Sequence, residues 1–329
     1  MDNRITKKRL TDYLSYEWIL IVIIVVVAMF VLELVYTVGS VRLTTGQEFK
    51  IYYDENLYSD KVDKLYNLMD REKTLSYDVL KSDIEALTSD YNVLGVRLSV
   101  QEGDIIITDS IEPSEDSEKT DVRAKKVIDT NPVYVLDDML KDAKSYLRSF
   151  LTDENAGPGA ELEFSNLSTE KINQKFLARM KKDNRFRSDK QKADGLVLEC
   201  ERIEKLCSDV KLFEYYLNNA PAEAFYSYTK YEQYKGSESA GNYTEEYENL
   251  YQKEIDEGRQ NARYGLNVLA LKTEGKTDPS DYFKVRNQAD STGVVIMAFN
   301  FLKYQPELQF ECISLMSTLI REFTNIVPV

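Results

Sequence analysis

The apolar positions of this 329-residue chain begin with a long run near the N-terminus. Residues 19–32 contain no polar side chain, and the apolar character resumes after Glu33. A helix over 18–38 would be about 30 Å long, which is the thickness of the hydrocarbon core of a bilayer. The pattern therefore predicts a single transmembrane helix over 18–38, with Trp18 and Tyr36 as aromatic membrane anchors.

The charges before this run predict its orientation. Arg4, Lys7, Lys8 and Arg9 precede it, and basic residues favour the cytoplasmic side. We therefore expect residues 1–17 in the cytoplasm and the rest outside the cell membrane. A cleaved signal peptide is the alternative, but the run is long and no A-x-A cleavage sequence follows it.

After the predicted transmembrane helix, residues 41–152 show both the strand and the helix periodicity of apolar positions, which predicts an α/β lobe. Polar residues with few apolar ones mark a surface loop over 110–122. Alternating or continuous apolar positions predict strands, and spacings of three and four predict helices. The predicted strands are 47–53, 93–100 and 104–108, and the predicted helices are 59–72, 76–89, 121–128 and 134–151.

A Gly/Pro-containing segment over 153–168 predicts a linker to a helix-rich lobe, 169–329. Ser188 and Gln191 form a capping-box pattern that opens a long helix to about residue 218. We interpret its apolar stripe as packing within the lobe, with an intermolecular coiled coil as the alternative. Further elements are predicted as helices over 169–182, 244–257 and 306–323 and as strands over 264–271 and 293–299. The predicted fold is α/β with a large helical part: one transmembrane helix followed by a mixed α/β, helix-rich extracytoplasmic domain.

Composition excludes several classes of chemistry. The chain has no histidine, so it cannot supply a Ser-His-Asp triad or a His-based zinc site. Its net charge of −14 leaves no basic footprint for nucleic acid. Calcium-loop, phosphate-loop and nucleophile-elbow motifs are missing from the sequence. We therefore expect no metal, no cofactor and no catalytic residues.

The three cysteines do not suggest a disulfide framework, since their number is odd. Cys200 and Cys207 share one predicted helix, where their Cα atoms would lie about 10 Å apart, beyond the reach of a disulfide. We interpret them, with Cys312, as small core side chains. So few cysteines in an exported chain favour a bacterial cell envelope.

The ends of the predicted extracytoplasmic part resemble one family. The strand at 49–52, the helical crossover, the strand at 96–100 and the segment Asp104-Ile105-Ile106-Ile107 resemble the first lobe of extracytoplasmic solute-binding proteins. The segment at 134–140 and the C-terminal strand and helix are similar to later elements of that family. The resemblance implies a membrane-anchored solute-binding protein associated with transport. The sequence departs from the family in its helical middle and in having no tryptophan outside the N-terminal run.

Tyrosine and arginine side chains are the candidate ligand-binding residues. A tyrosine ring with its polar tip suits a sugar, a peptide or a partner surface, although such residues also fill cores. A planar guanidinium can clamp an anion, although local ion pairs are the common alternative. The candidates are Tyr215, Tyr226, Tyr231, Tyr264, Arg185 and Arg187.

These observations favour a membrane-tethered binding or interaction protein without catalysis. Its expected partners are the lipid bilayer, a small-molecule, sugar or peptide ligand, and a membrane complex. Two alternatives stay open: a carboxylate-dependent hydrolase of cell-envelope polysaccharide, and a scaffold subunit of an envelope complex. Abundant carboxylates leave the first open, and the apolar stripe of the long helix leaves the second.

Overall fold

A computed structural model describes most of the chain in two compact units, residues 1–44 and 45–329. The described residues are 7–39, 43, 46–87, 92–111, 123–157, 159–236, 242–301 and 305–327. The predicted acidic loop over 110–122 falls almost entirely outside them.

The first unit contains helix α1 (Lys7–Gly39), on which Trp18 is exposed. Within the described residues, no helix combines the length and the apolar character that a membrane crossing requires. The predicted transmembrane helix is therefore wrong. Glu33 ends the unbroken apolar run at residue 32, after about 21 Å of helix, whereas a bilayer core is about 30 Å thick.

The second unit is built on a six-stranded sheet in the order β2-β1-β3-β6-β5-β4. Strands β2, β1 and β3 are parallel, and β6, β5 and β4 continue the sheet through antiparallel pairs. Parallel neighbours require crossover connections, which the intervening helices supply. The strands are β1 (Glu48–Asp54), β2 (Lys81–Leu87), β3 (Ile105–Asp109), β4 (Phe225–Tyr228), β5 (Ala262–Asn267) and β6 (Val294–Ala298).

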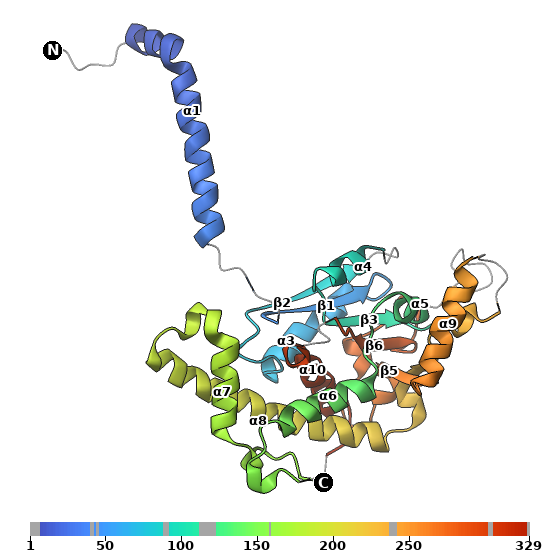
Figure 1. The fold of residues 1–329 in the computed structure, drawn as a ribbon. Helices are drawn as coiled ribbons and strands as arrows, with labels where there is room; N and C mark the ends of the chain where they lie inside the picture. The colour runs from blue at the N-terminus through green and yellow to red at the C-terminus, as the bar shows by residue number, and fades with distance from the viewer. Residues whose placement is uncertain are drawn as a thin grey trace. The chain divides into compact units, whose positions relative to one another are not determined.

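Alternate side chains of the strands enter two separate apolar clusters. Ile105 and Ile107 belong to one cluster, and Ile106 belongs to the other. The first cluster joins the sheet to α3, α6, α8 and α10, and the second joins it to α4 and α5. The strand period of two thus produces a sheet covered by helices on both faces (Figure 1). The helices are α2 (Ser59–Val62), α3 (Lys64–Arg71), α4 (Asn92–Ser99), α5 (Arg123–Thr130), α6 (Leu136–Arg148), α7 (Thr169–Arg179), α8 (Asp189–Asn219), α9 (Asn242–Asp256) and α10 (Glu311–Phe323).

For two elements the predicted secondary structure is wrong: one predicted helix is a strand, and one predicted strand is a helix. Within the helix predicted over 76–89, residues 81–87 form strand β2, which pairs in parallel along its whole length with β1. The strand predicted over 93–100 is helix α4, in which Leu94 and Leu98, four residues apart, are buried while Val96 is exposed. Pairing with a distant strand overrides the helical spacing in the first case. In the second case, a short apolar run fits both periods and the buried face decides between them.

The C-terminal half contributes to the same sheet as the N-terminal half. Strand β6 pairs with β3, and the segment predicted as a linker over 153–168 places Leu162 and Leu167 in the apolar core. Residues 45–329 therefore form one compact unit.

Candidate functional site

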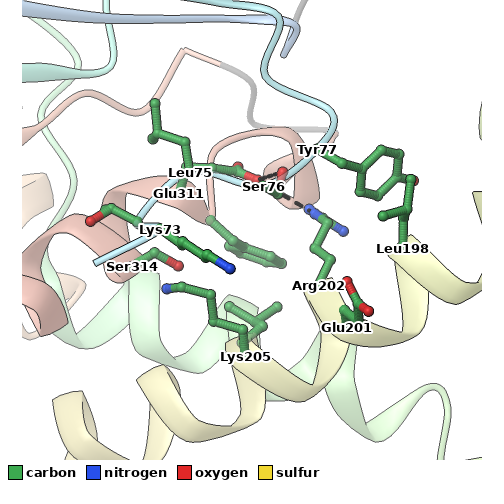
Figure 2. Close-up of a pocket in the computed structure, with 13 residues that line it drawn as sticks. Lys73, Leu75, Ser76, Tyr77, Leu198, Glu201, Arg202, Lys205, Glu311 and Ser314 are labelled. Carbon is green, nitrogen blue, oxygen red and sulfur yellow. Dashed lines mark hydrogen bonds and ion pairs between the residues drawn. The ribbon is translucent and has the colours of Figure 1, made fainter. Parts of the chain in front are cut away.

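A pocket of about 220 Å³ opens beside the turn after α3, between α8 and the start of α10 (Figure 2). Leu75, Leu198, Leu206 and Phe310 supply its apolar lining, and its other lining residues are charged or hydroxylated. Typical small-molecule pockets measure about 300–1,000 Å³. This pocket therefore suits a molecule at or below the lower end of that range.

Two ammonium groups and a hydroxyl occupy one side of the pocket. Figure 2 shows the ends of Lys73 and Lys205 approaching the same region as the hydroxyl of Ser314. The Lys205 Nζ lies 2.5 Å from Asp209 Oδ2, one turn further along α8. Neither the Lys73 ammonium nor the Ser314 hydroxyl makes a hydrogen bond or ion pair to the described residues. This side of the pocket is therefore cationic, with donors left over for a ligand.

The turn after α3 positions Lys73. Its φ of 47° is left-handed, a region that few residues other than glycine and asparagine adopt readily. The Lys73 N–H donates to the carbonyl of Asp70 at 3.1 Å, and the Thr74 N–H donates to that of Met69 at 2.9 Å. These bonds use carbonyls that the helix end would leave unpaired, so the turn is a helix cap.

Arg202 forms the inner wall of the pocket and is fully engaged by the protein. Its side chain is 5% exposed, and its Nη2 donates to the carbonyl of Glu307 at 2.7 Å. Its guanidinium also lies 3.3 Å from Glu199 and 3.4 Å from Glu311. Burial opposes its charge, but the two carboxylates raise its pKa well above the ordinary value. Arg202 is therefore a fixed structural cation.

The same carboxylates continue into a buried ion-pair cluster, which we define as Asp78, Arg179, Glu199, Arg202 and Glu311. Arg179 bridges Asp78 and Glu199. Burial raises the pKa of Asp78, and the charges of Arg179 and Arg202 counteract that increase. The cluster thus connects α7, α8 and α10 to the 76–78 segment behind the pocket.

The two candidate arginines lie outside the pocket, and Arg185 contacts the ion-pair cluster. Arg185 donates to Asp78 Oδ1 at 2.9 Å and to Asp183 Oδ2 at 2.7 Å. Its guanidinium is therefore held within the protein. Arg187 is exposed and donates to Asn184.

The candidate tyrosines lie elsewhere, and the structure does not gather them into the pocket. Tyr215 is half-buried on α8. Tyr226 and Tyr264 lie on the adjacent strands β4 and β5, and both contact the second apolar cluster. Tyr231 has a left-handed φ of 65°, and its ring lies 5.9 Å from that of Tyr247.

Sequence reasoning did not single out the pocket residues. Lys73, Lys205 and Ser314 belong to no motif, and they are separated by more than a hundred residues at each step. The lysine after the helix predicted over 59–72 gave no sign in the sequence of the left-handed turn or of a pocket.

The buried carboxyl of Asp104 lies outside this pocket. Burial raises the pKa of Asp104 to about 8, with further contributions from Glu311 and Glu48, but Asp104 lies beneath the start of α10. In the part of the chain that the structure describes, no three cysteine or carboxylate residues gather as a metal site requires.

Comparison with protein-family models found no match, and comparisons with curated proteins and with solved structures found none either. The resemblance to solute-binding proteins stays a prediction, and so does the extracytoplasmic location, which was inferred from the charges before the N-terminal apolar run.

Proposed function

We propose that this chain is a small-molecule binding protein, and that its pocket takes an anion with a compact apolar body. One observation carries the proposal. Two lysine ammonium groups and the Ser314 hydroxyl face the same side of a pocket whose lining also includes Leu206 and Phe310. A carboxylate or phosphate accepts charge-assisted hydrogen bonds from such donors, which are stronger than neutral ones.

The electrostatics of the surrounding protein support an anion rather than a cation. Glu311 already accepts from Ser76 at 2.7 Å and pairs with Arg202, so its charge is compensated inside the wall. The Lys205 ammonium has Asp209 as its partner, but Asp209 also pairs with Arg321. Lys73 adds a charge that the described protein does not compensate. A net-acidic chain would therefore hold an anion at this locally cationic point.

The pocket favours binding over polysaccharide hydrolysis. Hydrolysis needs two carboxyls facing each other across a cleft, one of them kept protonated. Of the two carboxylates in the lining, Glu311 is engaged by Arg202, and Glu201 is exposed. This arrangement presents positive charge and apolar contacts to a ligand, rather than a carboxylic acid that could protonate it.

Calorimetric titration of the full chain with hexanoate, phenylacetate and inorganic phosphate tests the proposal. Hexanoate or phenylacetate should bind, and phosphate should bind more weakly because it has no apolar part. Lys73→Asn removes the ammonium while keeping a residue that tolerates the left-handed φ, and it should weaken binding about tenfold.

The matched control is Lys141→Gln, which removes an exposed lysine on α6 outside the pocket. It should leave the affinity within about twofold. The proposal fails if none of the three anions binds, or if Lys73→Asn and Lys141→Gln bind them equally well.

A further inference from the structure

A second concave surface lies where α7 ends and α8 begins. It is a groove of about 750 Å³ that includes Leu177, Met180, Lys181, Phe186, Arg187 and Lys192 in its lining. It shares none of these residues with the pocket beside Lys73. We refer to it as the basic groove.

The residues around the groove carry a net positive charge, whereas the chain as a whole is negatively charged. Residues 181–192 include six basic and two acidic residues, whereas the whole chain has a net charge of −14. Of the two acids, Asp183 is held by Arg185 at 2.7 Å. Lys181 and Arg187 are exposed, and the described residues offer Lys181 no carboxylate partner. The groove is therefore a local positive site on an acidic protein.

The Phe186 ring in the apolar part of the groove packs against two other aromatic rings. The ring of Phe186 packs edge-to-face against Phe176, with centroids 5.2 Å apart, and against Tyr77 at 6.1 Å. Gly195, in the second turn of α8, permits this packing, because an added Cβ would meet the Phe186 ring at 2.6 Å. A surface held in one shape before binding avoids part of the entropic cost of association.

We propose that the basic groove binds an acidic peptide segment of a partner protein, with one apolar side chain of that segment resting against Met180 and Phe186. The exposed cations at its edge complement acidic residues on both sides of such an anchor. A lipid surface fits less well, since the site is hollow whereas a bilayer surface is flat. Nucleic acid fits less well, since its affinity depends on neutralising many phosphates along an extended surface, whereas the basic residues here lie within 181–192. This proposal does not depend on the ligand of the pocket.

The test uses fluorescence anisotropy with a fluorescein-labelled peptide, Glu-Glu-Asp-Phe-Glu-Glu, and the full chain. The peptide should bind, and changing its phenylalanine to serine should weaken binding about tenfold, because the apolar anchor is lost. The double variant Lys181→Glu/Arg187→Glu should weaken binding of the original peptide at least tenfold.

The matched control is Lys64→Glu/Lys141→Glu, which changes net charge equally at exposed sites on α3 and α6. It should change the affinity less than threefold. If the charge reversal unfolds the chain, as judged by circular dichroism, Lys181→Gln/Arg187→Gln replaces it, with an expected loss of about fivefold.

Three outcomes would overturn the proposal. The first is that no peptide binding is detected. The second is that the groove and control variants lose affinity equally, which would indicate general electrostatic attraction. The third is that phosphatidylglycerol vesicles or a single-stranded oligonucleotide bind more tightly than the peptide and show the same dependence on Lys181 and Arg187.

Discussion

The sheet and most of the ion-pair cluster are buried, but they are built from opposite chemistry. Ile106 and Ile296 in the sheet are at most 1% exposed, and Glu199 and Arg202 in the cluster are 2% and 7% exposed. The sheet gains stability from removing apolar surface from water. In the cluster, each charge loses its hydration and depends on its partners to compensate. Burial by itself therefore does not say whether a substitution leaves a void, a clash or an unpaired charge.

The largest expected effect comes from removing one charge of the cluster. Arg202→Met leaves Glu199 and Glu311 buried without their shared cation, which should lower the free energy of unfolding by about 3–5 kcal/mol. Urea unfolding of the full chain measures the change. The same substitution in an exposed pair, Arg71→Met, should cost less than about 1 kcal/mol. Similar losses for the two variants would contradict the claim that the buried charges of the cluster depend on their partners more than exposed charges do.

A steric change in the sheet should have a smaller effect. An added Cβ at Gly265 on β5 would lie 2.7 Å from the carbonyl oxygen of Ile296, and backbone cannot move aside as a side chain can. Gly265→Ala should therefore lower the free energy of unfolding by about 1–3 kcal/mol. The control is Gly95→Ala in α4, where the added Cβ meets no atom within 4 Å and should stabilise the helix by up to about 1 kcal/mol. A stabilised Gly265→Ala variant would contradict the described packing of β5 on β6.

The third expected effect depends on pH and comes from Asp104, where the two regions meet. Its Oδ2 accepts from the Lys50 N–H at 2.8 Å, and its carbonyl accepts from the Phe299 N–H at 2.9 Å. Burial raises the folded-state pKa of Asp104 to about 8, above its ordinary value of 3.8. The folded chain thus binds this proton more tightly than the unfolded chain. The stability from this group is present below about pH 4 and is lost as the pH rises to about 8.

Asp104→Asn keeps an oxygen acceptor for Lys50 and removes the titration. The difference in melting temperature between the variant and the original chain should therefore move in favour of the variant between pH 5.5 and pH 8.5. The exposed control Asp189→Asn should show the same difference at both pH values. A constant difference for Asp104→Asn as well would mean that this carboxyl does not titrate in that range.

Local signals in the sequence were sufficient for several elements. Ser188 and Gln191 form the predicted capping box at the start of α8, where Gln191 N–H donates to Ser188 Oγ at 3.2 Å. The buried strands predicted over 104–108 and 293–299 are β3 and β6, displaced by about one residue at their ends. The cap and the continuous apolar runs involve residues close together in the chain, so they can be recognised without knowing the fold.

Three features depended on the tertiary structure alone: the strand conformation of 81–87, the pocket beside Lys73 and the buried ion-pair cluster. Residues 81–87 became a strand because β1 lies alongside, and the pocket exists because the turn at Lys73 meets α8 and α10. Arg202 meets Glu311 across more than a hundred residues of sequence. Such contacts are set by how whole elements pack. Spacing along the chain carries no information about them, whereas helix caps and strand alternation depend only on neighbours a few residues away.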